Sequence, residues 1–324
     1  MVRIAILDDL QGEALQLAAW QSLPAGTQVQ SLRDTAADED ELVRRLTDFE
    51  VVVAMRERTA FPASVIERLP NLRLLASTGL RNAAIDLAAC RRRGVVVTGS
   101  RGSSNGRGST CEIAWALILA LSKKLLPSHQ ALHDGRWQPL LAGGLMGNVL
   151  GLAGLGNVGS RMAQVGRAFG MEVIAWSPNL TTERAAQHGA KAVSCDALFA
   201  QADIVSLHLV LSERTAGLVS GDRLAQMKPD ALLVNTARAA LVDEQALLQA
   251  LRQRRIAGAG LDVFWQEPLP AGHPLLTLDN VVLTPHLGYA TRDNLRAFYG
   301  GVVANILAWL EGRPLLLLQD SEAR

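Results

Sequence analysis

Three ionisable side chains in the second half of the chain each stand a few residues after a short apolar run that predicts a β-strand: Arg238, Glu267 and His286. An imidazole can give and take a proton near neutral pH, and a neighbouring carboxylate can orient it and favour its charged form. A guanidinium suits planar anions. Because ligands of open α/β sheets bind beyond the carboxyl ends of the strands, we expect these side chains to face one cleft. They suit acid–base chemistry on a bound anion.

A glycine motif of the form G-x-G-x-x-G lies earlier, at Gly154, Gly156 and Gly159. It follows the apolar run 149–153, opens a predicted helix at 158–169, and is followed by a predicted strand at 173–176. The first glycine allows a tight turn, the second lets a pyrophosphate approach the backbone, and the third lets the helix pack closely. The helix N-terminus, at Asn157 and Val158, offers amide hydrogens to phosphates. The motif in this context predicts a dinucleotide-binding unit.

The residue at the end of the strand after the motif bears on the choice between NAD and NADP. NAD-specific sites usually carry Asp or Glu there, which accepts a hydrogen bond from the ribose 2′-hydroxyl. This chain has Ser177, and Arg184 follows seven residues later. Serine does not repel a 2′-phosphate, so the sequence leaves both cofactors open.

Short apolar runs alternate along the chain with longer stretches of helical spacing, which predicts parallel sheets covered on both faces. The first series of runs is 2–7, 51–55, 72–76 and 95–98. Its helical stretches are 12–21, 38–49, 62–69 and 83–93. The second series of runs is 149–153, 173–176, 204–209, 231–235, 259–263 and 281–284. We therefore expect two doubly wound α/β lobes.

Residues 99–109, GSRGSSNGRGS, contain no apolar side chain and predict a hinge between the lobes. A long apolar helix is expected at 111–126, and a final helix at 291–311 is expected to return and complete the first lobe. The expected domains are a substrate domain, residues 1–99 with 292–324, and a cofactor-binding domain, residues 100–291.

The ordered motifs GLGNVG, NTAR, GAGLDVF followed by EP, and TPHLG resemble the D-isomer-specific 2-hydroxyacid dehydrogenases, which include phosphoglycerate, glycerate and D-lactate dehydrogenases. The resemblance covers nearly the whole chain and is strongest from Asn148 to Tyr289. It implies a Rossmann cofactor-binding domain and a flavodoxin-like substrate domain with the active site in the cleft between them. It also implies catalytic roles for Arg238, Glu267 and His286.

The resemblance implies further binding residues. Asp262 is expected to hold the nicotinamide carboxamide, and Leu209 to flank the adenine. Other cofactor contacts are expected at Thr236, Ala237 and Gly288. On the substrate side, the backbone amides near Gly79 and Leu80 are expected to bind the substrate carboxylate, and Arg56 aligns with a position that faces substrate.

This residue set suits the reduction of a 2-oxo acid by NADH or NADPH. The carbonyl carbon receives a hydride and the carbonyl oxygen a proton, for which His286 is the expected donor. Glu267 would orient the imidazole, and Arg238 would bind the substrate carboxylate and polarise the carbonyl. In the reverse direction His286 would be the base.

Two alternatives remain. Some relatives with this fold act as transcriptional corepressors, so a nicotinamide-responsive binding protein with weak turnover is the second hypothesis. Formate dehydrogenases carry Gln where this chain has Glu267, which makes formate a poor candidate. Departures from the usual pattern at Ala239, Val210 and the loop 79–83 weaken any transfer of substrate identity. Glyoxylate, hydroxypyruvate, pyruvate and bulkier 2-oxo acids all remain open.

Composition narrows the class of protein. Lys and Arg number 32 and Asp and Glu 31, so the net charge of +1 argues against a nucleic-acid binder. Three cysteines favour a reducing cytoplasm. We expect no secretion signal and no membrane span, because the longest apolar run, 113–121, has about half of the roughly 20 residues required. We expect no metal: His129 and His133 are four residues apart without a third ligand. A homodimer through the cofactor domain is expected, with Trp137 a possible contact.

Overall fold

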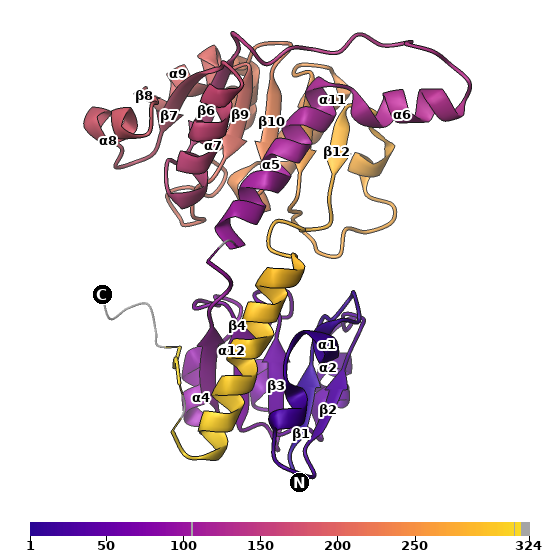
Figure 1. Cartoon of the computed structure of the whole chain (residues 1–324), viewed down its shortest axis with the longest axis vertical. Coiled ribbons are helices and arrows are strands. Elements are labelled where there is room, and N and C mark those ends of the chain that lie inside the picture. The colour runs from indigo at the N-terminus through magenta and orange to yellow at the C-terminus, as the bar shows by residue number, and fades with distance from the viewer. Residues whose placement is uncertain (105, 314, 319–324) are drawn as a thin grey trace. The chain divides into compact units, whose positions relative to one another are not determined.

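The computed structural model describes residues 1–104, 106–313 and 315–318. The chain divides into two compact units (Figure 1). Unit 1 comprises Met1–Gly106 and the segment that begins at Thr291, and unit 2 comprises Arg107–Ala290.

Unit 1 is built on a five-stranded sheet in the order β2-β1-β3-β4-β5, and every pairing between these strands is parallel. The strands are β1 (Arg3–Ile6), β2 (Gln28–Ser31), β3 (Val51–Ala54), β4 (Leu74–Thr78) and β5 (Val96–Ser100). The helices are α1 (Ala14–Leu17), α2 (Glu39–Leu46), α3 (Ala63–Ile66), α4 (Leu87–Arg92) and α12 (Arg292–Leu310). The returning helix α12 packs against β4 and β5 (Figure 1), as the sequence predicts.

Two details of unit 1 differ from the sequence prediction. The stretch 12–21 forms the short helix α1 and a separate 3-10 turn, Trp20–Ser22, because the indole of Trp20 turns back to donate to the Ala14 carbonyl at 2.8 Å. The edge strand β2 escapes the search for apolar runs. Its residues alternate between exposed and half-buried, as an edge strand allows.

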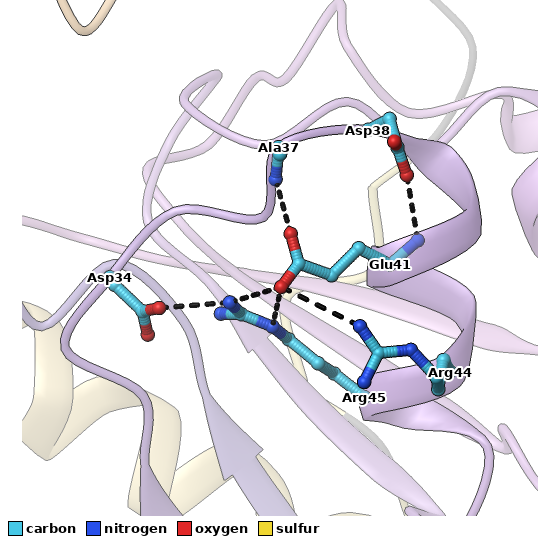
Figure 2. A network of polar contacts seen from close by, with 6 residues as sticks. All are labelled: Asp34, Ala37, Asp38, Glu41, Arg44 and Arg45. Carbon is cyan, nitrogen blue, oxygen red and sulfur yellow. Dashed lines mark hydrogen bonds and ion pairs between the residues drawn. The ribbon is translucent and has the colours of Figure 1, made fainter.

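Helix α2 shows how local chemistry starts an element (Figure 2). The Asp38 carboxylate accepts from the Glu41 amide at 2.8 Å, and the Glu41 carboxylate accepts from the Ala37 amide at 2.7 Å. These two bonds satisfy amide donors that a helix start leaves unpaired. Arg45 joins Glu41 to Asp34. The Ala37 amide and Arg45 lower the pKa of Glu41, so the network is intact at neutral pH.

Unit 2 is built on a seven-stranded parallel sheet in the order β12-β11-β10-β9-β6-β7-β8. The strands are β6 (Val149–Ala153), β7 (Glu172–Trp176), β8 (Lys191–Ala192), β9 (Ile204–Leu207), β10 (Leu232–Asn235), β11 (Gly258–Leu261) and β12 (Val281–Leu283). The helices are α5 (Gly106–Ser122), α6 (Leu125–His133), α7 (Asn157–Ala168), α8 (Thr182–Gln187), α9 (Cys195–Gln201), α10 (Gly221–Gln226) and α11 (Glu244–Arg252).

The long helix predicted at 111–126 is broken in the structure. Helix α5 begins earlier, at Gly106 inside the expected hinge, and ends at Ser122. Lys124 has a φ of 52°, a left-handed conformation that a continuous helix does not tolerate, and α6 starts after it. Small residues tolerate the first turn of α5, which the buried side chains Cys111, Ala114 and Trp115 anchor on unit 2.

The sheet of unit 2 is buried on both faces, which explains why its strands are continuously apolar. Along β10, Leu232 and Val234 belong to one core with Trp115 and Met162, whereas Leu233 points into the other core with Phe199. The register places the last residues of β6, β7, β9, β10, β11 and β12 at one edge. None of the helices in the described residues has the length and apolarity that a membrane span requires.

Candidate active site

The glycine loop between β6 and α7 is shaped by contacts that only glycine allows. Gly154 has a φ of 102°, and a Cβ there would lie 2.7 Å from the His208 carbonyl oxygen. A Cβ on Gly159 would overlap the Gly154 carbonyl oxygen, so α7 packs directly on the loop. Gly156 has nothing within 4 Å of its Cβ position, which leaves open space at the start of the helix.

That open space fits a dinucleotide pyrophosphate. No side chain caps α7 at Gly156, and the first backbone bond of the helix runs from the Ser160 amide to the Gly156 carbonyl. The amides of the first turn are therefore available to an anion. The Thr236 hydroxyl, at the end of β10 on the same edge, is buried and has no hydrogen-bond partner among the described residues, as expected of a group that awaits a ligand.

His286 and Glu267 form a direct pair. The His286 Nδ1 lies 2.7 Å from Glu267 Oε2, with both side chains about a quarter exposed. The second oxygen of Glu267 accepts from the Phe264 amide at 3.0 Å, so the carboxylate is held on both sides. Because a carboxylate only accepts, Nδ1 carries the hydrogen and Nε2 is the nitrogen left to exchange a proton with a ligand.

The loop that carries His286 is anchored by Asp262, which is fully buried. Its carboxylate accepts from the Thr284 hydroxyl at 2.6 Å and from the amides of Leu287 and Gly288 at 2.7 and 2.8 Å. These bonds lie on both sides of His286, whose φ of 55° is strained for a non-glycine residue. Burial raises the pKa of Asp262, while the three hydrogen bonds and the His286 charge act in the opposite direction.

Tyr289 is a neighbour of His286 that sequence reasoning missed. The two rings meet edge to face, with centroids 5.5 Å apart and planes at 81°. Such packing restricts the rotation of the imidazole about the bond to Glu267. The signal in the sequence was an aromatic residue directly after the TPHLG motif.

Arg238 stands in a turn after β10, on the strand next to β11. The Asn235 side chain organises this turn by donating to the Arg238 carbonyl at 2.9 Å and accepting from the Ala237 amide at 3.0 Å. The half-buried guanidinium donates to the Ala237 carbonyl at 2.8 Å. The structure thus places Arg238, Glu267 and His286 after three adjacent strands, β10, β11 and β12.

The remaining cofactor candidates surround the same edge. Ser177 is half-buried directly after β7, and the partly buried Leu209 and Ala237 pack against the apolar core. His208 follows β9 with its ring nitrogen Nε2 2.9 Å from the Ser206 hydroxyl. Burial lowers the pKa of His208 to about 4.

In unit 1, Arg56 and Gly79 lie together at the carboxyl ends of β3 and β4. Arg56 has a φ of 51°, and its amide donates to the Thr78 hydroxyl at 2.9 Å. Asn82, another residue that sequence reasoning missed, donates to the Arg56 carbonyl. A Cβ on Gly79 would lie 3.3 Å from Arg56 Nη1.

One expectation about this loop needs correction. The Gly79 amide donates to the Ser100 carbonyl at 2.9 Å, so it is already used within the sheet and does not point to a substrate carboxylate. The neighbouring Leu80 is 41% exposed, and its amide has no backbone partner among the described residues. Leu80 and Arg56 are the better donors.

No cluster of three or more His, Cys, Asp or Glu side chains in the described residues is placed to hold a metal ion. His129 and His133 lie on α6 with ring centroids 4.5 Å apart.

Comparisons with known proteins address the identity of this site. The profile of the D-isomer specific 2-hydroxyacid dehydrogenase, NAD binding domain, matches residues 115–288. A glyoxylate reductase of Aeropyrum pernix is 35% identical over 293 residues, which cover 88% of this chain and 84% of the relative. The chain belongs to the D-isomer-specific 2-hydroxyacid dehydrogenases. The resemblance inferred from the motifs is thereby confirmed.

Other members of this dehydrogenase family differ in length. A D-3-phosphoglycerate dehydrogenase of Archaeoglobus fulgidus is 36% identical over 261 residues, which cover 80% of this chain and 49% of the relative. The chain therefore spans about half the length of that relative. The crystal structure of a phosphoglycerate oxidoreductase from Vibrio cholerae o395 superposes with a TM-score of 0.90 at 39% identity, covering 96% of this chain and 100% of that one. The predicted fold class is confirmed.

Proposed function

We propose that this dehydrogenase reduces a small 2-oxo acid to the D-2-hydroxy acid with NADH or NADPH, and catalyses the reverse oxidation. The observation that carries the proposal is the His286–Glu267 pair, 2.7 Å apart, at the same sheet edge as the glycine loop. A proton donor and a dinucleotide cradle on one edge are what carbonyl reduction by a nicotinamide requires.

The roles of the chain's residues follow from their contacts. A bound nicotinamide cofactor supplies the hydride that reaches the carbonyl carbon. His286 gives the Nε2 proton to the carbonyl oxygen, while Glu267 holds Nδ1 and stabilises the charged ring. Arg238 binds the substrate carboxylate through its planar fork and draws charge toward the developing alkoxide.

Unit 2 binds the cofactor in this proposal, and unit 1 contributes substrate contacts. Gly154, Gly156 and Gly159 form the phosphate loop, with the amides of Asn157 and Val158 turned to the pyrophosphate. Asp262 and Thr236 serve the nicotinamide half, since the Thr236 hydroxyl lacks a partner among the described residues. Arg56 and the Leu80 amide take the substrate carboxylate from unit 1.

A short 2-oxo acid is the proposed substrate, and glyoxylate and hydroxypyruvate are the first to test. The glyoxylate reductase of A. pernix, which this chain matches over most of its length, supports this choice. Ser177 carries no charge and admits a 2′-phosphate, so we expect NADPH to be accepted as well as NADH.

A homodimer in the cytoplasm completes the proposal. Helix α6 and the segment after it expose several large apolar side chains: Leu125, Leu126, Leu132, Trp137, Leu141 and Met146. Trp137 and Leu141 are 79% and 96% exposed, which is unusual for a monomer surface. A second copy of the chain is the proposed cover. Trp137→Glu should shift the mass measured by light scattering from two chains toward one, whereas an unchanged mass would contradict this contact.

Absorbance assays of NADH and NADPH oxidation against a panel of 2-oxo acids test the proposed reaction. Turnover that His286→Ala abolishes supports it. Tight NADH binding without turnover of any acid would instead favour the nicotinamide-responsive binding protein. The relatives reported above carry the names of oxidoreductases, so they support the enzyme hypothesis and lend nothing to the binding-protein one.

A further inference from the structure

A polar groove in unit 2 is left unused by the proposed reaction. It has a volume of about 500 Å³ and lies along α7 and the end of α8. Its polar lining comprises Ser160, Arg161, Gln164, Arg167, Gln187 and His188. The volume is in the range of small-molecule sites, and the lining offers hydrogen-bond donors almost throughout.

The charge of the groove is positive. Two guanidinium groups and an imidazole line it, and no carboxylate does. Within the described part of the chain, no carboxylate lies within 4.0 Å of the side-chain nitrogens of Arg161 or Arg167. Glu112 is the acidic group nearest to Arg161: both side chains flank Gly108, with Arg161 Nη1 2.8 Å and Glu112 Oε1 3.8 Å from its Cβ position. The forks of both arginines are therefore available to a ligand.

Arg167 is held in place by the backbone beneath it. It lies over Gly189, which has a φ of 66°, and a Cβ at that position would overlap the Arg167 Nη1 atom. The bare glycine follows His188, so the loop after α8 brings the imidazole and the guanidinium to one wall of the groove. A fixed guanidinium loses less freedom on binding than a freely rotating one.

The groove is separate from the phosphate loop. Arg167 stands 11 residues after Gly156 on one helix, which at 1.5 Å per residue is about 16 Å along the axis. A pyrophosphate on the amides at the start of α7 cannot also contact Arg167 and His188. The two sites share only the helix.

We propose that this groove binds a small multivalent oxyanion, a phosphate or polycarboxylate compound distinct from the cofactor. Arg161 and Arg167 each provide a planar fork that matches phosphate or carboxylate oxygens, and His188 and Gln164 add further donors. The inference does not depend on the proposed reaction.

Calorimetric titration of the full chain tests the proposal, with inorganic pyrophosphate in one arm and tricarballylate in the other. Saturating NADH is present so that the phosphate loop is covered, and potassium chloride matches the ionic strength. We expect one saturable site for at least one anion, and the stronger arm identifies the ligand type. Absence of saturable binding in both arms overturns the proposal.

Matched variants locate the site. Arg161→Gln with Arg167→Gln should weaken binding by on the order of 100-fold, because each loses charge-assisted hydrogen bonds. Arg252→Gln, an exposed arginine on α11 outside the groove, removes one charge and should change affinity less than twofold. Equal affinity of the double variant and wild type overturns the assignment.

A labelling experiment on the wild type does not depend on the folding of a variant. Phenylglyoxal modifies accessible arginines, and peptide mass spectrometry reports each position. The bound anion should slow modification of Arg161 and Arg167 but not of Arg252, whereas equal rates with and without the anion contradict the proposal.

Discussion

Two histidines follow strands of the same sheet, and their surroundings are opposite. His208 comes after β9 and meets the neutral Ser206 hydroxyl at 2.9 Å, and its burial lowers its pKa to about 4. His286 comes after β12, is partly exposed and faces the Glu267 carboxylate at 2.7 Å. The first ring stays neutral beside the glycine loop, and the second can carry charge. Residue type and strand-end position are the same, so the partner and the burial assign the roles.

Replacement of His286 breaks the comparison at its reactive end. His286→Ala should lower the rate of 2-oxo-acid reduction by about 10²- to 10⁴-fold, because the proton donor is lost. NADH affinity, measured by fluorescence titration, should stay within a few-fold. A variant that retains full turnover with every accepted acid would falsify the assigned role.

The buried histidine should instead control stability. The unfolded chain binds a proton at His208 below its ordinary pKa of 6.5, whereas the folded chain does so only below about 4. Stability should therefore fall as pH drops from 6.5 to 4, by up to about 3 kcal/mol from this residue. Urea unfolding across this range measures the loss, and His208→Gln should flatten it. Equal pH dependence in both proteins would contradict the prediction.

Glu267→Gln sharpens the difference between the two histidines by making the partner of His286 neutral. The charged imidazole loses its stabilising anion, so the protonated donor persists only to lower pH. The pH at which the reduction rate falls by half should move down by about one unit. The pH profile of kcat/KM measures this shift, with His208→Gln as the control that leaves it in place. An unmoved profile would show that Glu267 has no electrostatic role.

Tyr289 gives the smallest expected effect. Tyr289→Leu removes the edge-to-face contact with His286 and should lower kcat by roughly two- to tenfold, since such contacts are worth about 0.5–1.5 kcal/mol. KM should change little, and Tyr289→Phe should restore most of the rate. Equal losses in both variants would assign the effect to the hydroxyl and not to the ring.

Sequence reasoning worked best where the chemistry is local. The glycine loop was predictable because three glycines, the strand before them and the helix after them lie within 30 consecutive residues, and the α/β alternation was predictable because both sheet faces are buried. The order of Arg238, Glu267 and His286 on successive strand ends followed from the same pattern. The strands β2 and β8 were missed because edge strands need not be continuously apolar.

The tertiary structure decided which of these groups meet. Asp262 accepts from residues 22 to 26 positions away, Glu267 meets a histidine 19 positions away, and the Gly79 amide is taken by Ser100 on the neighbouring strand. The pKa of His208 likewise depends on what encloses the ring. The sequence by itself determined the element types and the residues present at each strand end, because these depend on neighbours along the chain. Hydrogen-bond partners and burial depend on which strands lie side by side, and only the folded sheet decides that.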